Sequence, residues 1–383
     1  MSTEGSMAVW ASPRSNTQTT GEVHFNYWRI SGHKEGVFGS GADDIAEIGV
    51  LLDSPTDVEE ISIFLPAKRA CLNISDCAPQ FSRVEIAQGI FNELLSCKSV
   101  GAPHPQSIEL ERVGGGLLCR VHQFPNVGGV LDPTQLSISE TSNGTIVTVM
   151  RKAINEACVN LPAGSAVYFR IRASINAKSE APFIKVISPK DSAFHSGFDE
   201  IEYIDFRFND TRTLPPQISS ELRKPDLVLF RVMAFLTAIP VSSNLTSSSS
   251  DPHKSRLLEK DVWKDYIPGG LPKGMMVYHW KKSNPNGVDS FSAFVKMQTR
   301  KTGIWVLFIY LGFALVFGMV GNLLASAVEG AFMADWRGET PSETSQKLEA
   351  TSSEGAAKVN DSQKGTGRPP VNVSARGGTH GAG

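Results

Sequence analysis

The sequence predicts an α+β protein: a mainly antiparallel β-sheet soluble region with a few helices, one C-terminal transmembrane helix and a disordered tail. Short apolar or alternating runs separated by turn residues continue to about residue 299, which predicts the sheet. An uninterrupted apolar run then predicts the membrane helix, and the polar composition after it predicts the tail. The chain has 383 residues, of which 41% are hydrophobic, enough to bury a core before the apolar run.

Composition divides the region before the apolar run into two parts. Residues 1–20 are polar and aperiodic, so we expect a flexible N-terminal arm. Residues 21–299 carry the sheet pattern and should form a cytosolic β-rich region. Pro162-Ala-Gly164 interrupts that region, which makes residues 160–165 a candidate subdomain junction.

Strands are predicted where β-branched and aromatic residues gather between turn residues. These runs are 23–30, 45–52, 61–65, 107–113, 117–124, 136–140, 145–150, 167–173, 183–187, 201–208, 275–282 and 290–299. Hairpins are expected at Gly114–Gly116, at Asn143-Gly144 and at residues 284–287, and the second should need a turn with positive φ. The side-chain alternation changes between Tyr203 and Ile204, which predicts a β-bulge.

Two helices are predicted in the first half of the chain. Apolar residues recur at helical spacing over 83–96, and a shorter candidate covers 150–159. Residues 227–239 are apolar but contain Arg231 and end at Pro240, so a buried strand or helix is expected rather than a second membrane span. The serine-rich residues 242–251 are expected to form a mobile loop.

The apolar run from Ile304 to Val328 contains no charged residue. A helix of about 20 such residues crosses the hydrocarbon core of a bilayer. Small residues recur along one helical stripe within it, at Ala314, Gly318, Gly321 and Ala325. Such a stripe lets two membrane helices approach closely and self-associate, but small residues are also common in membrane helices that do not.

Charges on either side of the span predict its orientation. Basic residues precede it at Lys281, Lys282, Lys296, Arg300 and Lys301. The N-terminus lacks the pattern of a secretory signal, and the positive-inside rule places the basic side in the cytoplasm. We therefore expect a single-pass protein, with a bacterial inner membrane favoured, whose five basic residues contact lipid headgroups and whose tail lies on the opposite side.

Few residues separate the last predicted strand from the span. The strand runs to about Thr299 and the span begins at Ile304, a reach of about 15 Å at most. The soluble region should therefore lie close to the bilayer. This proximity is compatible with passive tethering and with mechanical coupling between the sheet and the span.

The rest of the sequence predicts a disordered tail and excludes several classes of partner. Residues 337–383 contain no aromatic residue and are rich in Ser, Gly and charged residues, so they should be disordered. A net charge of −2 predicts no nucleic-acid partner. The five cysteines form no CxxC pair and are expected to be free thiols in a reducing compartment. We expect no cofactor.

Local motifs predict no catalytic or metal site. Gly36, Gly39 and Gly41 lack the order of a dinucleotide or phosphate-binding loop. The eight histidines show no metal-ligand spacing, and no Gly-x-Ser-x-Gly elbow is present. A catalytic site assembled from residues distant in the sequence remains compatible with this pattern.

One charged surface is a candidate for ligand binding. Residues 167–173 alternate, with Phe169 and Ile171 on one face and Arg170 and Arg172 on the other. Together with Arg207 on a neighbouring strand, these arginines could hold a phosphate or carboxylate. The alternative is a solvated face, on which the arginines pair with the acidic residues of 199–205.

Three functional hypotheses follow. The first is a non-enzymatic sensor or effector that binds an unknown ligand or protein partner and whose span contacts the bilayer and forms a homo-oligomer. The second is a membrane-tethered enzyme, hydrolase-like, which predicts a pocket lined by polar groups with perturbed pKa values. The third is a scaffold, which predicts a large exposed apolar patch.

Overall fold

The computed structural model describes residues 5–14, 19–30, 43–100, 106–176, 181–186, 199–268, 270–271, 274–300 and 304–336. The chain divides into two units, Met1–Phe308 and Ile309–Gly383. The first unit is a mixed, sheet-rich fold with few helices, and residues 160–165 lie within it. The second contains most of the long helix α5, Ile304–Trp336.

The smaller of two large sheets has the strand order β11-β12-β4-β1-β15-β20-β17, with β14 beside β15. Its strands are β1 (Ser6–Pro13), β4 (Val58–Leu65), β11 (Leu136–Thr141), β12 (Gly144–Val149), β14 (Ile184–Val186), β15 (Asp199–Phe208), β17 (Ser243–Ser248) and β20 (Phe291–Arg300). Most neighbours are antiparallel, but β1 and β15 run parallel. The sheet is therefore mixed.

The larger sheet has the order β18-β19-β16-β2-β3-β13-β8-β7-β6, with β5 beside β13. Its strands are β2 (Thr20–Trp28), β3 (Asp44–Leu52), β5 (Leu72–Asp76), β6 (Leu95–Val100), β7 (Ser107–Arg112), β8 (Gly115–His122), β13 (Ala166–Ile175), β16 (Leu229–Pro240), β18 (Lys254–Leu257) and β19 (Met275–Ser283). The pairs β16/β2 and β13/β8 are parallel, so this sheet is also mixed. A separate small ladder joins β9 (Asn126–Val127) and β10 (Val130–Leu131).

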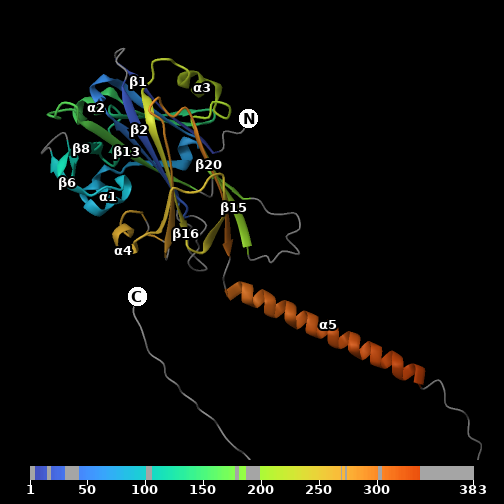
Figure 1. Cartoon of the computed structure of the whole chain (residues 1–383). Helices are drawn as coiled ribbons and strands as arrows, with labels where there is room; N and C mark the ends of the chain where they lie inside the picture. Colours follow the sequence, from blue (N-terminus) through green and yellow to red (C-terminus); the bar gives the residue numbers. More distant parts are fainter. Residues whose placement is uncertain are drawn as a thin grey trace, which may run out of the picture. The chain divides into compact units, whose positions relative to one another are not determined.

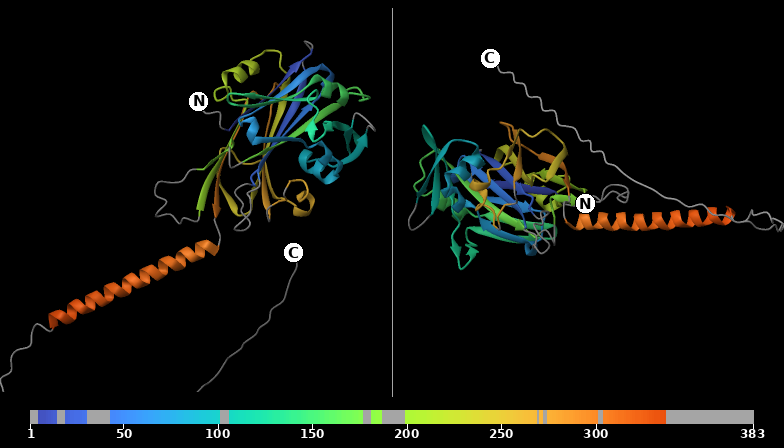
Figure 2. Two further views of the ribbon diagram at one scale, coloured as in Figure 1. Left: turned by 180° about the vertical axis from the view of Figure 1, so that it is seen from behind. Right: turned by 90° about the horizontal axis from the view of Figure 1, so that it is seen from below.

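The helices of the first unit are short and lie outside the strands (Figures 1 and 2). They are α1 (Val84–Phe91), α2 (Arg151–Ala157), α3 (Pro216–Leu222) and α4 (Lys260–Trp263), with 3-10 turns at Pro55–Asp57, Arg69–Cys71 and Ala78–Ser82. The structure confirms the two helices predicted in the first half. The first is shorter than expected because Asn92 adopts a left-handed conformation (φ 55°) and ends it.

The main core lies between the two sheets. Alternate residues of the central strands point into it, and the buried cluster includes side chains from both sheets. Phe206 of β15 stacks on Phe25 of β2 with ring centroids 4.4 Å apart and on Phe235 of β16 at 4.5 Å. Because β15 belongs to the smaller sheet and the other two strands to the larger, these rings pack the sheets face to face.

A buried ionic cluster also joins the sheets. The Arg29 guanidinium, directly after β2, contacts Asp44 at 3.0 Å and forms a bidentate interaction with Glu202 of β15. Tyr27 donates a further hydrogen bond to Asp44 at 2.7 Å. All four side chains are buried or nearly so, which makes this an ion cluster that would be costly to disrupt.

The outer face of the larger sheet carries a second layer. Ile86 of α1 and Trp263 of α4 belong to one apolar cluster with Trp28 of β2 and Tyr266. A further cluster packs Phe81 against Tyr168 of β13. The larger sheet is therefore covered on both faces over much of its area, and Glu47, Arg170 and Arg172 on its outer face are buried.

Two segments differ from their predictions by forming strands. Residues 1–20 were expected to form a flexible arm, but Ser6–Pro13 is β1, buried between β4 and β15. The short apolar run Met7-Ala-Val-Trp10 is sufficient to form a buried strand because β4 and β15 pair with it on both sides. Residues 242–251 were expected to form a loop, but Ser243–Ser248 is the edge strand β17, anchored by Leu245 packing against the core.

Three predictions about local geometry were wrong. The strands at 275–282 and 290–299 form no hairpin, since β19 pairs with β16 and β20 pairs with β15 and β17 in the other sheet. No bulge interrupts β15, because Glu202 points inward to Arg29 and the alternation is unbroken. The β11–β12 hairpin is confirmed, but neither Ser142 nor Asn143 at its turn has positive φ.

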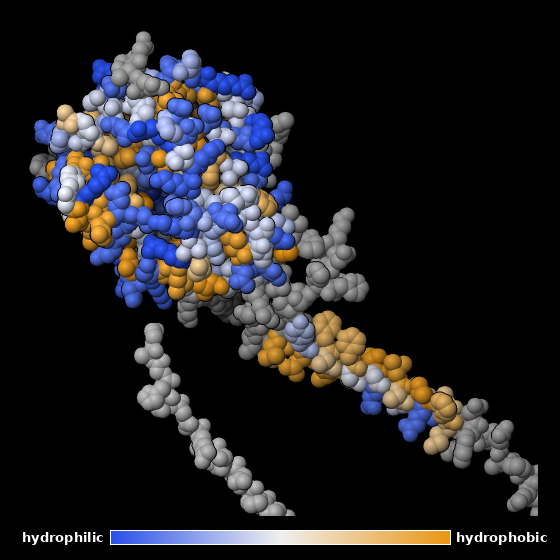
Figure 3. Space-filling model, viewed as in Figure 1, coloured by the Kyte–Doolittle hydropathy of each residue, from blue (hydrophilic) through white to orange (hydrophobic). Residues whose placement is uncertain are grey.

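Helix α5 is long and apolar enough to cross a membrane, by length and composition. Its candidate span is Tyr310–Met333, with mean hydropathy 2.0. Side chains of this span are exposed, and hydrophobic residues cover most of the helix in Figure 3. The tail expected at 337–383 lies outside the described residues.

Candidate functional site

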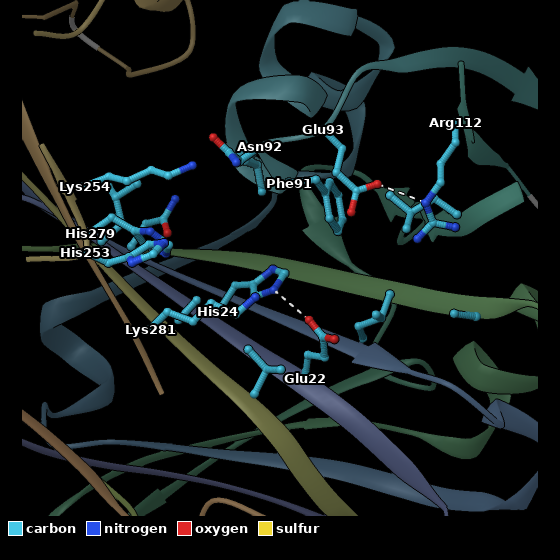
Figure 4. A pocket seen from close by; sticks show the side chains of 18 of the residues that line it. Glu22, His24, Phe91, Asn92, Glu93, Arg112, His253, Lys254, His279 and Lys281 are labelled. Atoms are coloured by element: carbon cyan, nitrogen blue, oxygen red, sulfur yellow. Dashed lines mark hydrogen bonds and ion pairs between the residues drawn. The ribbon is translucent and has the colours of Figure 1, made fainter. Parts of the chain in front are cut away.

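The outer face of the larger sheet contains a cavity of about 340 Å³ between the second layer and strands β18 and β19. Its floor is formed by β2, β16 and β19, and one wall by the end of α1 and the residues that follow it. We call it the sheet pocket. Its lining includes Glu22, His24, Asn26, Phe91, Asn92, Glu93, Arg112, Ala234, Leu236, His253, Lys254, His279 and Lys281 (Figure 4).

Strand register explains why the floor is hollow and polar. His24 of β2 lies beside Ala234 of β16, which lies beside Lys281 of β19. The adjacent row is formed by Asn26, Leu236 and His279 in the same strands. The small Ala234 leaves space between two longer polar side chains, whose Cα atoms lie roughly 10 Å apart, two strand spacings.

The imidazole of His24 is held from both sides. Its Nδ1 lies 3.2 Å from the Tyr168 hydroxyl, and its Nε2 lies 3.6 Å from the Glu22 carboxylate. Arg170 Nη1 donates to the same hydroxyl at 2.9 Å, so the hydroxyl proton is free to be donated to Nδ1. With Nδ1 accepting from this hydroxyl, the contacts assign a ring proton to Nε2, toward Glu22. The hydrogen bond from His24 is the largest cause of the lowered pKa of Glu22.

The position of Tyr168 depends on Gly49. A Cβ atom on Gly49 would lie 1.8 Å from the Tyr168 hydroxyl oxygen, which is far closer than any van der Waals contact. Gly49 lies between Arg170 and His24 in the strand register. Because Gly49 has no side chain, the Tyr168 hydroxyl can lie between Arg170 and His24.

Beside the pocket, on the same face of the larger sheet, lies the Glu47 network, formed by Glu47, Arg170 and Arg172 with their hydrogen-bond partners. Glu47 is fully buried and accepts from Arg170 Nη2 at 2.7 Å and from Arg172 Nε and Nη2 at 2.9 and 2.7 Å. It also accepts hydrogen bonds from Trp28 (3.3 Å), Cys77 (3.5 Å) and Tyr266 (2.8 Å). Burial alone would raise the pKa of Glu47, but the two arginines lower it to about 2.

Two guanidinium groups on one carboxylate leave the Glu47 network with one surplus positive charge. Oriented to satisfy its neighbours, the Asn26 amide accepts from Arg170 Nη2 at 2.6 Å and so connects this network to the pocket floor. Among the described residues, the buried Nε of Arg170 has no hydrogen-bond partner. The network thus adds positive potential beside the β2 edge of the pocket floor.

Three basic groups face one end of the pocket. Lys254 of β18 lies beside His279 of β19, and Lys281 follows two residues later on the same face. In the described part of the chain, neither ammonium has a carboxylate within ion-pair distance. Burial, followed by the neighbouring basic groups, lowers the pKa of His279 from 6.5 to about 4. His279 is therefore neutral at pH 7.

The opposite wall is aromatic and apolar. The Phe91 ring contacts Tyr168 and His24 edge-on, with centroids 5.0 and 5.7 Å apart. Figure 4 shows the lysine and histidine side chains at one end and the Glu93–Arg112 ion pair (3.0 Å) at the other. The sheet pocket therefore has a basic end and an opposite end where the Phe91 ring lies next to the Glu93–Arg112 ion pair, which we call the aromatic end.

The three arginines predicted to bind a ligand do not meet. Arg170 and Arg172 both lie on β13 and point to one face as expected, but they are buried and bound to Glu47. Arg207 lies on β15 in the smaller sheet and pairs with Asp205. The expectation of adjacent strands was wrong because the chain changes sheets between β13 and β15. The solvated-face alternative fails for Arg170 and Arg172.

The predicted headgroup-contacting residues also separate. Lys281 lines the sheet pocket, and Lys282 points to the other face of β19, donating to the Ser290 carbonyl at 2.8 Å. Lys296 lies on β20 in the other sheet. Arg300 ends β20, and Lys301 lies outside the described residues. The stripe residues Ala314, Gly318, Gly321 and Ala325 are exposed on α5.

The histidines of the pocket were not recognised in the sequence. A signal was present, because Glu22, His24 and Asn26 alternate with Val23, Phe25 and Tyr27 in a strand that otherwise reads as buried. All five cysteines are free thiols, as predicted. Among the described residues, no three His, Cys, Asp or Glu side chains are placed to hold a metal ion. Comparison with known proteins finds no matching family model and no curated protein of similar sequence.

Proposed function

We propose that this protein is a membrane-anchored binding protein whose sheet pocket takes a small anionic ligand. One observation carries the proposal: Lys254 and Lys281 line a cavity beside His279, and neither forms an ion pair in the described part of the chain, although Glu22 of the same cavity interacts electrostatically with Lys281. The surplus positive charge of the Glu47 network lies beside the pocket on the same face of the sheet, next to β2. Cavities with a few convergent polar groups are the usual form of small-molecule sites.

The affinity of the full chain for sulfate, measured calorimetrically in detergent, tests this proposal. Lys281→Ala should weaken binding by about 10- to 100-fold, the equivalent of one charge-assisted hydrogen bond. Lys282→Ala is the matched control, since it removes the same charge one residue away on the opposite face of β19. Equal effects of the two substitutions, or no sulfate binding by the parent protein, would contradict the proposal.

For localisation, we propose that α5 crosses the bilayer once with the sheet-rich unit in the cytoplasm. Its length and hydropathy support the span, and the basic residues before Ile304 support the orientation. A bacterial inner membrane is the favoured location. Protease added outside intact cells should digest the C-terminal tail and spare the sheet-rich unit. Digestion of that unit would reverse the orientation.

As a sensor or effector, the protein would transmit ligand binding through α5. The small-residue stripe supports self-association of this helix, and a Cβ added at Gly318 or Gly321 would meet open space beside the helix's own backbone. Gly321→Ile should then reduce crosslinked oligomers in membranes, whereas Leu315→Ile should leave them unchanged. Unchanged oligomer populations in the glycine variant would contradict self-association through the stripe.

The second candidate is an enzyme, because the pocket combines convergent polar groups with perturbed pKa values for Glu22 and His279. Both ring nitrogens of His24 already have partners, so His279 is the better acid–base candidate. The test is hydrolysis of a chromogenic phosphate ester by the parent protein and by His279→Ala. Turnover that disappears in this variant would favour the enzyme over the binding protein.

A further inference from the structure

We infer that the anionic ligand is a phosphate monoester attached to a planar aromatic ring, and that the two parts occupy opposite ends of the sheet pocket. The inference rests on the proposed function and specifies the chemistry of its ligand. A nucleoside monophosphate is the simplest probe with both parts. The argument uses the charge at one end, the aromatic wall at the other, and the distance between them.

The basic end matches a dianion better than a monoanion. Lys254 and Lys281 carry two positive charges, and a phosphate monoester carries about −1.5 to −2 at pH 7. A carboxylate would leave one ammonium without a counter-charge. Neutral His279 adds a ring N–H between them that can donate to a phosphate oxygen. Lysine ammonium groups bind phosphate as point charges and do not require the planar geometry of an arginine.

The aromatic end is already ordered. Phe91 is half-buried, and its ring contacts Tyr168, His24 and Phe81 at centroid distances of 5.0, 5.7 and 6.2 Å. These contacts hold the ring in place before a ligand arrives, which reduces the entropy cost of stacking. Ile90 and Leu118 extend the apolar wall. A planar ring is the ligand group that gains most from this surface.

The separation of the two ends suits such a ligand. Phe91 packs on His24 of β2, and Lys281 lies two strands away on β19. Two strand spacings put the Cα atoms of His24 and Lys281 roughly 10 Å apart, so a ligand that reaches both Phe91 and Lys281 must be elongated and cross the floor. Asn92 lies beside Phe91, and its amide has no hydrogen-bond partner among the described residues. One amide offers the donor and acceptor that a base edge requires.

The experiment compares inorganic phosphate, adenosine and adenosine monophosphate as ligands of the full chain in detergent. The monophosphate should bind at least tenfold more tightly than phosphate, because one stacked base contributes about 1–3 kcal/mol. Phe91→Leu should remove about tenfold of that advantage while leaving phosphate affinity unchanged. Phe294→Leu is the matched control, since Phe294 is an exposed aromatic residue on the smaller sheet.

The outcomes separate the two proposals. Equal affinities for phosphate and the monophosphate, both reduced by Lys281→Ala, would overturn the aromatic ring and keep the anion site. Tight adenosine binding that Lys281→Ala does not affect would overturn the phosphate end. If Phe91→Leu lowers the melting temperature by more than Phe294→Leu does, the comparison of the three ligands on the parent protein still decides the inference without any variant.

Discussion

Replacing Glu47 by glutamine removes the only carboxylate that contacts both Arg170 and Arg172 in the described part of the chain. The substitution preserves the size of the side chain and one acceptor oxygen. It leaves two buried guanidinium groups without a counter-charge, because Glu47 and Arg170 are fully buried and Arg172 nearly so. It also places an amide N–H₂ group among donors. The loss should therefore appear as reduced stability of the first unit.

The expected magnitude follows from two independent estimates. Removing one partner of a buried ion pair costs about 3–5 kcal/mol. The pKa of Glu47, lowered from 4.5 to about 2, corresponds to about 3 kcal/mol. A domain of this size loses about 2 °C in melting temperature per kcal/mol, so Glu47→Gln should lower it by roughly 6–10 °C.

The pH dependence provides a second measurement on the same variant. Because the folded pKa of Glu47 lies below the unfolded value, its stabilisation is present above pH 4.5 and is lost as the pH falls toward 2. The difference between the parent protein and Glu47→Gln should shrink over that window. Thermal unfolding followed by intrinsic tryptophan fluorescence measures both effects.

The control for this prediction is Glu221→Gln. Glu221 pairs with Lys224 at the surface, where an exposed ion pair contributes less than about 1 kcal/mol. Its melting temperature should therefore match that of the parent protein to within 2 °C. A similarly small change in Glu47→Gln would refute the reasoning, because the buried charges would then have been compensated by other groups.

Three further predictions concern the pocket and its surroundings. Gly49→Ala should displace Tyr168 and weaken anion binding at least tenfold. In the control Gly115→Ala the added Cβ would meet open space, so the affinity for the anion should equal that of the parent protein. Equal affinities of the two variants would contradict the role of Gly49. Sulfate should bind more tightly as the pH falls from neutral toward 4, since a bound dianion raises the pKa of His279 above its value of about 4 in the free pocket. Calorimetry of His279→Ala should show a weaker trend, because His24 and His253 also line the pocket, and an unchanged trend would contradict the role of His279. Burial raises the pKa of Asp76 from 3.8 to about 7, so the free energy of unfolding should fall by on the order of 4 kcal/mol as the pH rises from 3.8 to about 7. Denaturant titrations of Asp76→Asn should lack this pH dependence. An identical pH dependence in the variant would assign it to another group.

Most strands could be predicted from the sequence because alternation is a local property. Strand partners could not, because pairing depends on contacts between distant segments. Residues 284–287 illustrate the difference: their turn composition predicted a hairpin, yet they connect β19 in one sheet to β20 in the other. Glu202 shows the same limit. The sequence pattern predicted a bulge in β15, whereas Glu202 points inward. Its buried partner, Arg29, is remote in the sequence, so local alternation could not reveal this position.

The candidate site was partly visible in the same way. Alternation placed Arg170 and Arg172 on one face of a strand, and the structure agrees. Their burial was unpredictable because the layer that covers them comes from α1, α4 and Tyr266, far away in the chain. His24 and His279 belong to strands separated by about 250 residues, and only the parallel pairing of β2 with β16 brings them together.

The strand order also constrains how the protein is made. β1 and β2, at the start of the chain, pair with β15 and β16, and β20 lies inside the smaller sheet between β15 and β17. Contacts of such long sequence separation slow folding because large loops must close first. During synthesis, neither sheet can be completed until almost the whole first unit has left the ribosome. The apolar α5 follows β20 directly, so targeting of the nascent chain to a bilayer would begin as the sandwich acquires its last interior strand.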